Sequence, residues 1–373
     1  MRRHGNVAAW LAALSLAGCG ELDDVTTVKD LRVLAVQAQP AGFLVPLDGP
    51  GAVAPRDLQA TLTALVVDPQ GQGQTLTFTG QACPDYLSTL QPLADQESRV
   101  CPDAAETAAL PPPLGSALAA TPLATADQPG QAPPIDAIEY HPQVAFGLTP
   151  AQVGLFFSPA LTGDAEVDAA IAYDRDFGMD AIVDLTFRLG SEQARVLKRL
   201  VYWPLLPPAL VPQSFAQPQV PNQNPRLLDL QLFRHRDAVT GEVMDPYPDA
   251  APTLSLSADD KLFVVPVPAP DAAERYLLRV RNTQTNVVET VDVARELLTY
   301  QFYATAGTFS PDTRQSELSP VFTSADGRVH LDSEYHPPKA TGVPADGRVT
   351  IWVVVRDERA GTSWDSRMFW IAP

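Results

Sequence analysis

Composition and charge exclude one broad class of function. The chain has 373 residues, and its 44 Asp and Glu against 26 Lys and Arg give a net charge of −18 at pH 7. A negative field of this size repels nucleic acid and anionic lipid headgroups, so nucleic-acid binding is excluded. The length allows two or three domains. Its 37 prolines favour turns, edge strands and linkers over helix interiors.

The N-terminus has the pattern of a cleaved export signal. Arg2 and Arg3 form a positive segment, residues 7–16 form an apolar run, and small residues lead into Cys19. The run is too short to cross a bilayer, which takes about 20 apolar residues. Residues 16–19, Leu-Ala-Gly-Cys, resemble the lipobox of bacterial lipoproteins. The alternative is an ordinary secretory signal that happens to contain a cysteine.

The resemblance implies a lipid anchor. In lipoproteins with this motif the cysteine thiol is acylated, palmitate being one such chain, and cleavage of the signal peptide (1–18) makes Cys19 the first residue. Each buried CH₂ contributes about 0.8 kcal/mol, so several acyl chains hold a protein at a membrane. Removing residues 1–18 takes away two arginines and no acids, so the charge moves from −18 to −20. In some bacteria an aspartate directly after the lipidated cysteine retains a lipoprotein at the inner membrane. This chain has Gly20 at that position, so we expect the anchor to lie in the outer membrane.

Two cysteines remain for the exported chain, Cys83 and Cys101. An exported protein meets an oxidising compartment, so a disulfide between them is the simplest interpretation. The closed loop of about 18 residues would contribute on the order of 3 kcal/mol. A metal site or a redox pair is less favoured, because two thiols at this separation match neither pattern.

The first predicted domain covers residues 31–203, after a polar tether at 19–30. Its expected strands lie at 31–40, 58–67, 75–79, 181–189 and 194–203, where apolar and polar residues alternate. Residues from about 80 to 148 interrupt this pattern with a small-residue, proline-rich stretch, so we expect a long and partly disordered insertion. Thr149 before Pro150 predicts a short helix that runs to Phe157.

Residues 204–225 are proline-rich and are expected to form a stiff linker. The second predicted domain follows at 226–373. Its expected strands lie at 226–233, 262–267, 276–281, 287–293, 298–304, 350–356 and 363–371. The segment 350–356 is apolar at both alternating sets of positions, which indicates a central strand covered on both faces.

Short strands with turn residues between them predict an all-β fold, namely two tandem Ig-like β-sandwich domains with a long insertion in the first. Three segments carry a resemblance: residues 28–35 (VKDLRVLA), 222–225 (NQNP) and 352–357 (WVVVRD). With the lipobox, they resemble uncharacterised envelope lipoproteins of the myxobacterial type, which carry Ig-like or PKD-like domains. This resemblance implies surface or periplasmic modules and transfers no catalytic residue.

One group of residues could bind a metal: His330, Asp332, Glu334 and His336. If this segment is a strand, the four side chains share one face. Neighbours at i and i+2 lie about 6.8 Å apart along a strand, so at most two of them could share one ion. A solvated polar face on an edge strand is favoured, and no metal or other cofactor is assigned beyond the covalent lipid.

A second acidic group, Asp164, Glu166 and Asp168, partly matches a calcium loop. The glycine of the sharp turn and the closing glutamate are missing from the pattern. In so acidic a chain, clustered carboxylates are expected by chance, and calcium stays a weak alternative.

Aromatic residues suggest another alternative. A sugar-stacking platform could use members of one set: Trp203, Trp352, Trp364, Trp370, Tyr300, Phe302 and Tyr303. Most are expected in the core, since the inner faces of a sandwich bury aromatic rings. Trp352 lies in an apolar run and is expected to be buried, whereas Trp364, beside a turn, is the better candidate for exposure.

The sequence contains none of the common local catalytic motifs, such as the Gly-x-Ser-x-Gly turn, the His-Glu-x-x-His helix or the Walker loop. We therefore expect a protein that is not an enzyme: a lipid-anchored interaction or structural module of the cell envelope. Its partners are the membrane, through the anchor, and an unidentified envelope protein or glycan. The alternative is a carbohydrate-binding protein or enzyme that uses an aromatic cleft.

Overall fold

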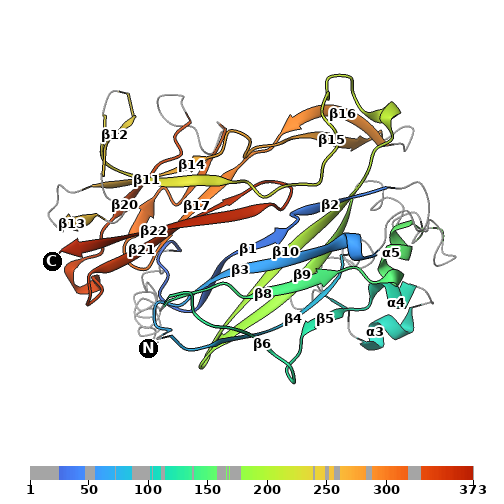
Figure 1. Cartoon of the computed structure of the whole chain (residues 1–373), viewed down its shortest axis with the longest axis horizontal. Coiled ribbons are helices and arrows are strands. Elements are labelled where there is room, and N and C mark those ends of the chain that lie inside the picture. The colour runs from blue at the N-terminus through green and yellow to red at the C-terminus, as the bar shows by residue number, and fades with distance from the viewer. Residues whose placement is uncertain are drawn as a thin grey trace, which may run out of the picture.

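The computed structural model describes residues 25–46, 55–71, 73–85, 101–102, 104–110, 114–136, 138–157, 165, 168, 178–237, 240–247, 252–255, 261–282, 288–317 and 329–372. Strands make up 52% of the described residues and helices 10%, so the all-β prediction is confirmed. Figure 1 shows two bodies of stacked sheets, with the earlier strands in one and the later strands in the other. The predicted signal peptide and Cys19 lie outside the described residues.

The first sandwich packs two sheets face to face. One sheet has the order β1-β3-β7, with β8 also paired to β3, and the other has the order β2-β10-β9-β4-β5, with β6 also paired to β4. The strands are β1 (Arg32–Gln39), β2 (Gly42–Val45), β3 (Gln59–Val67), β4 (Leu76–Pro84), β5 (Thr121–Ala124), β6 (Gly130–Ala132), β7 (Glu139–Tyr140), β8 (Gln143–Gly147), β9 (Met179–Leu189) and β10 (Glu192–Pro204).

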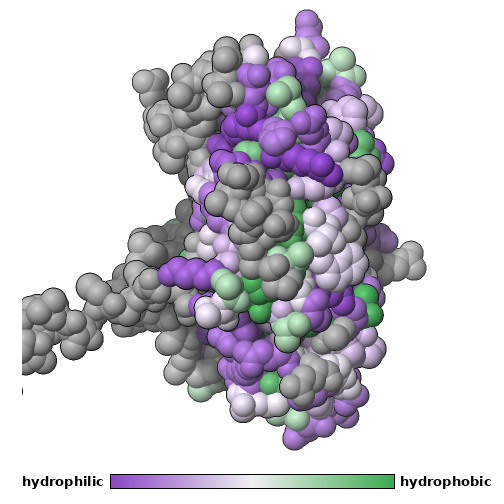
Figure 2. Space-filling view, turned by 90° about the vertical axis from the view of Figure 1, so that its left-hand side faces the viewer, coloured by the Kyte–Doolittle hydropathy of each residue, from purple (hydrophilic) through white to green (hydrophobic). Residues whose placement is uncertain are grey.

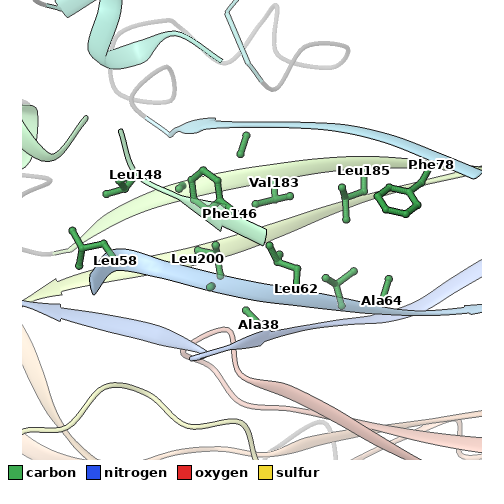
Figure 3. Close-up of a cluster of buried hydrophobic side chains, with 14 of the residues drawn as sticks. Ala38, Leu58, Leu62, Ala64, Phe78, Phe146, Leu148, Val183, Leu185 and Leu200 are labelled. Carbon is green, nitrogen blue, oxygen red and sulfur yellow. The ribbon is translucent and has the colours of Figure 1, made fainter. Parts of the chain in front are cut away.

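The core of this sandwich follows from the alternation of its strands. Along β9 the odd-numbered residues are buried and the even-numbered ones are not, as the sequence pattern predicts. Figure 3 shows Val183 and Leu185 of β9 in one cluster with Leu62 of β3 and Phe146 of β8. Each strand thus turns one row of apolar side chains inward, which is how a period of two produces a sandwich core.

The predicted insertion is more ordered than expected in its described part. Its residues form the helices α3 (Ala104–Ala109) and α4 (Leu114–Leu118) and the strands β5 to β8. β8 pairs antiparallel with β3, and β5 and β6 pair with β4. These residues complete both sheets. Even short, proline-containing strands can form hydrogen bonds with the unpaired backbone groups of an edge strand. The helix predicted after Thr149 is α5 (Pro150–Phe157).

The second sandwich also packs two sheets. Their orders are β12-β11-β14-β20-β18 and β13-β22-β21-β17-β19. The strands are β11 (Leu227–Arg236), β12 (Val243–Pro246), β13 (Thr253–Ser255), β14 (Leu262–Pro268), β17 (Thr299–Ala304), β18 (Thr308–Ser310), β19 (Thr313–Gln315), β20 (Ser333–His336), β21 (Arg348–Arg356) and β22 (Thr362–Ala372). β21 pairs with β17 on one side and β22 on the other, so its prediction as a central strand is confirmed.

A separate hairpin lies beside the second sandwich. β15 (Arg275–Arg281) pairs antiparallel with β16 (Val288–Arg295) as a two-stranded sheet. Figure 1 shows the hairpin extending past the second sandwich, above β2 of the first. The remaining short elements are the 3-10 turns η1 (Pro55–Leu58), η3 (Pro208–Leu210) and η4 (Ala340–Gly342). In the part of the chain that the structure describes, no helix has the length and hydropathy to cross a membrane.

The predicted disulfide is present. Cys83, at the end of β4, is bonded to Cys101, and their Cα atoms lie 5.7 Å apart. Both cysteines are buried. The bond fixes the start of the helical segment to the sheet β2-β10-β9-β4-β5.

Candidate functional site

The two sandwiches meet through a third apolar cluster. It consists of Val28, Leu34, Ala35, Leu65, Val67, Trp352 and Val354. β1 and β3 contribute one side of it and β21 contributes the other, so the inner sheet of each sandwich is covered on both faces. Figure 2, which faces the left-hand end of Figure 1, shows hydrophobic residues near the middle of that end and polar residues toward its extremes.

Polar contacts cross the same junction. Trp352 Nε1 donates a hydrogen bond to Glu139 Oε2 of β7 at 2.8 Å. Arg356 Nη2 donates to the carbonyl oxygen of Leu34 in β1 at 2.7 Å. Lys198 of β10 is buried and its Nζ donates to Ala360 O at 2.5 Å and to Thr362 Oγ1 at 3.2 Å. Burial lowers the pKa of Lys198 to about 8.

The end of the predicted tether is part of this junction. Val28 N donates to Ala304 O at 2.8 Å, and Ala304 N donates to Thr26 O at 2.9 Å. Thr27 forms a parallel bridge with Ala304 and donates its Oγ1 hydrogen to Gly307 O at 2.6 Å. Residues 26–28 therefore extend the edge of the second sandwich before the chain enters β1 of the first.

The predicted linker is also bonded at its end. Asn222 is fully buried, and its Nδ2 donates to Asp357 Oδ2 and to Arg359 O, each at 3.2 Å. Asn224 Nδ2 donates to Ala38 O at 2.7 Å, and Asn224 Oδ1 accepts from Thr362 N at 2.9 Å. The segments 28–35, 222–225 and 352–357, far apart in sequence, thus meet at one place in the fold.

A buried ion cluster holds the base of the β15–β16 hairpin. Arg359 Nε donates to Glu296 Oε1 at 2.6 Å and Arg359 Nη2 donates to Glu274 Oε2 at 2.7 Å. Glu296 is 1% exposed, and desolvation raises its pKa to about 7 against the opposing effect of Arg359. Asp357 beside it has a pKa raised chiefly by burial. The two glutamates flank the hairpin, so Arg359 ties both of its ends to the turn between β21 and β22.

Next to this cluster a cleft opens between the two sandwiches, with a volume of about 250 Å³. Its lining comes from β2, β10, the 204–225 segment, β15 and the β21–β22 turn. The lining residues are Leu44, Trp203, Phe215, Gln219, Val220, Glu274, Arg275, Tyr276, Leu277, Leu278, Arg279 and Arg359. Trp203 lies opposite Leu44 in the parallel pairing of β10 with β2, which places both at one edge of the first sandwich. We name this the hairpin cleft.

Two side chains give the hairpin cleft its polar character. The guanidinium carbon of Arg279 lies 5.6 Å from the ring centroid of Trp203, a cation–π contact. Arg279 Nη2 donates to Pro204 O. Among the described residues, neither Arg279 Nη1 nor Trp203 Nε1 has a hydrogen-bond partner, and both atoms are shielded from solvent. Burial lowers the pKa of Arg279 to about 10.

The predicted metal residues do not lie on one strand. β20 begins at Ser333, so His330 and Asp332 precede it and only Glu334 and His336 belong to it. Glu334 forms an ion pair with Lys261 at 2.9 Å, and Asp332 forms one with Arg236. No group of three or more ligating side chains that could hold an ion occurs within the described ranges. Of the calcium alternative, Asp164 and Glu166 lie outside those ranges.

The aromatic set is divided among different environments. Trp352, Tyr300 and Phe302 are fully buried, as expected. Trp364 is partly buried and therefore more exposed than Trp352, as expected. Its ring packs against His141 of the first sandwich with centroids 5.6 Å apart, whereas Trp370 is 38% exposed. Only Trp203 of this set lines the hairpin cleft.

The hairpin cleft was not predicted from the sequence. Arg279 and Trp203 are far apart along the chain, and each lies in a stretch that predicts an ordinary strand. The sequence of β15 contains three arginines, Arg275, Arg279 and Arg281, and does not indicate which of them lies over Trp203.

No protein-family model and no curated protein matches the sequence. Among solved structures, dimeric latent PorU from Porphyromonas gingivalis is 9% identical with a TM-score of 0.18, and the match covers 92% of this chain and 24% of that one. Red sea bream transglutaminase is 9% identical with a TM-score of 0.21, covering 93% of this chain and 32% of that one. The chain therefore spans less than a third of either protein.

Proposed function

We propose that the chain is a lipid-anchored protein of the cell envelope, held at the outer membrane through Cys19, that acts as a non-catalytic interaction or structural module. The lipobox and the export signal before it support the anchor. The junction between the sandwiches supports the module: an apolar cluster, with hydrogen bonds across it, holds two sheet surfaces in one arrangement. A binding surface that spans both sandwiches would then be preformed, which reduces the entropy lost on binding.

The attachment of the N-terminal segment supports the same proposal. Because Thr26 and Val28 are hydrogen-bonded to Ala304, only residues 20–25 separate the lipidated cysteine from the folded body. Such a short connection would keep the sandwiches close to the membrane surface. The mature charge of −20 opposes direct contact with anionic headgroups, so the lipid would supply the attachment.

Proximity cross-linking on intact cells, followed by mass spectrometry, tests the interaction role. The proposal predicts one reproducible envelope protein linked to residues on both sandwiches, and a junction variant such as Trp352→Ala should lose that pattern. Recovery of bulk envelope proteins alone, in proportion to their abundance, would contradict it.

The alternative, an envelope carbohydrate-binding protein or enzyme, has one feature in its favour, since Trp203 and Tyr276 line a cleft. Envelope polysaccharide should then quench tryptophan fluorescence in the wild type and not in Trp203→Phe. An unchanged spectrum across a polysaccharide titration would leave the non-catalytic module as the better account.

A further inference from the structure

Two side chains that line the hairpin cleft each carry a buried hydrogen-bond donor with no acceptor among the described residues. Trp203 Nε1 and Arg279 Nη1 are shielded from solvent and have no acceptor in the described part of the chain. A buried donor left unpaired costs about 1–3 kcal/mol, and more when the group is charged. Two such donors on side chains in direct contact with each other indicate a place for an acceptor from outside the protein.

The charge of the hairpin cleft indicates which acceptor fits. Glu274, the acidic residue of the lining, is hydrogen-bonded to Arg359, so the charges of these two compensate each other. Arg279 has a carbonyl oxygen as its partner and no carboxylate within the described residues. A guanidinium forms its strongest hydrogen bonds with carboxylates and phosphates, often through two parallel N–H groups.

The remaining walls are apolar. Leu44 and Phe215 line one part and Leu277 and Leu278 another. At about 30 Å³ for each water-sized group, a volume of about 250 Å³ suits a small molecule of some eight heavy atoms or a few more. Binding sites of this kind combine apolar walls with a few polar groups that orient the ligand.

We propose that the hairpin cleft binds a small amphipathic carboxylate. Its carboxylate accepts hydrogen bonds from Arg279 and Trp203, and its apolar chain lies against the leucines and Phe215. The donors are covered in the structure, so the ligand reaches them as the β15–β16 hairpin moves aside. Within the described residues the hairpin pairs with no other sheet and is held at its base by Arg359, so its strands can shift about that base. This proposal does not depend on the lipid anchor.

Octanoate is a suitable probe, with octanol and octylammonium as its neutral and positively charged counterparts. Calorimetric titration would use the full chain carrying Cys19→Ala, which needs no detergent that would compete for the apolar probe. We expect saturable binding of octanoate with one site per chain. Octanol should bind about tenfold more weakly or worse, and octylammonium should not bind, because a lost charge-assisted hydrogen bond corresponds to at least that factor.

Three variants distinguish hydrogen bonding by Arg279 and Trp203 from a general electrostatic attraction of the probe. Arg279→Met should weaken octanoate binding about tenfold or more, and Trp203→Phe, which keeps the ring and removes the N–H, should weaken it about threefold to tenfold. Arg295→Gln is the matched control. It removes an equal charge from the same hairpin, but its side chain is exposed and does not line the hairpin cleft, so binding should change less than about twofold.

The outcome that overturns the proposal is equal binding of octanol and octanoate, or the absence of saturable octanoate binding. Equal weakening by Arg295→Gln and Arg279→Met would also overturn it, because the attraction would then be general. Should Arg279→Met fail to fold, Arg279→Lys takes its place. That variant keeps the charge and loses the second N–H of the fork, and its affinity must fall below that of the wild type.

Discussion

Trp352 and Glu139 form a hydrogen bond across the junction, with Nε1 of the indole 2.8 Å from Oε2 of the carboxylate. The tryptophan belongs to β21 of the second sandwich and the glutamate to β7 of the first. Glu139 Oε1 also contacts His141 Nε2 at 2.7 Å. Trp352, the largest side chain in the apolar cluster, thus donates its one polar hydrogen to a residue of the opposite sandwich. This hydrogen bond favours a single orientation of the two sandwiches.

Shortening Trp352 should therefore destabilise the whole protein. Trp352→Ala removes a fully buried side chain and should cost about 3–5 kcal/mol in the free energy of unfolding. Trp352→Phe keeps most of the packing and loses the hydrogen bond, so about 1–3 kcal/mol is expected. Urea denaturation measures both. Trp370→Phe, at a side chain that is 38% exposed on β22, is the control and should stay within about 0.5 kcal/mol of wild type; a loss equal to that of Trp352→Phe would refute the junction's role.

Lys198 should make stability depend on pH in the alkaline range. Burial lowers its pKa from 10.5 to about 8, so the folded chain binds this proton less tightly than the unfolded chain does. Below about pH 8 the buried charge lowers the free energy of unfolding. This cost disappears as the pH rises to about 10.5, so the free energy of unfolding should increase by an amount on the order of 3 kcal/mol. Unfolding free energies measured between pH 7.5 and 10.5 should rise in wild type relative to Lys198→Met. Parallel curves for the two proteins would argue against a shifted pKa.

Gly361 lies in the turn that joins β21 to β22, against Asp357. A Cβ atom at this position would lie 2.0 Å from Asp357 Oδ2 and 2.9 Å from the backbone oxygen of Gln223. Gly361→Ala should therefore disturb the turn and cost at least about 2 kcal/mol, since Asp357 also accepts hydrogen bonds from two amides of this turn.

The matched control is Gly154→Ala in α5, where an added Cβ meets nothing within 4 Å. Replacing a helical glycine by alanine should raise stability by about 0.5–1 kcal/mol. Thermal unfolding of the two variants should shift in opposite directions. A stabilised Gly361→Ala would mean that the turn has room that the structure does not show.

Removing the Cys83–Cys101 disulfide should lower stability by about 3 kcal/mol in the chain-entropy account. The double variant Cys83→Ser, Cys101→Ser tests this by denaturation, and reduction of the wild-type protein should produce a comparable loss. Peptide mapping without reductant is the direct check on the bond. Free thiols at both positions in the exported protein would contradict it.

Local patterns in the sequence predict much of this fold. The alternation along residues 181–189 identified an inward face, and the apolar run 350–356 indicated a strand covered on both sides. Both inferences need only the period of a strand, which is a property of neighbouring residues. The sequence pattern could not predict which residues cover the second face of β21. That face packs through Trp352 against Val28 and Leu34, which lie in a distant part of the chain.

The same limit applies to the hairpin cleft and to the linker. Nothing near Trp203 in the sequence indicates that Arg279 lies over its ring. Proline content correctly suggests that residues 204–225 avoid helix and sheet interiors, but Asn222 and Asn224 act through side-chain hydrogen bonds to both sandwiches, which composition does not encode. The segments 28–35, 222–225 and 352–357 all contribute contacts at the junction, and the family resemblance inferred from them stays a prediction.

The most direct test of the central claim is acylation at Cys19. Cells that express the chain would be labelled with an alkyne-bearing palmitate analogue and then fractionated, with Cys19→Ala in parallel. The lipid-anchor account predicts a labelled wild-type protein in the outer-membrane fraction, and an unlabelled Cys19→Ala protein released from that fraction. A label that persists in Cys19→Ala, or a wild-type protein that is neither labelled nor membrane-bound, would contradict it.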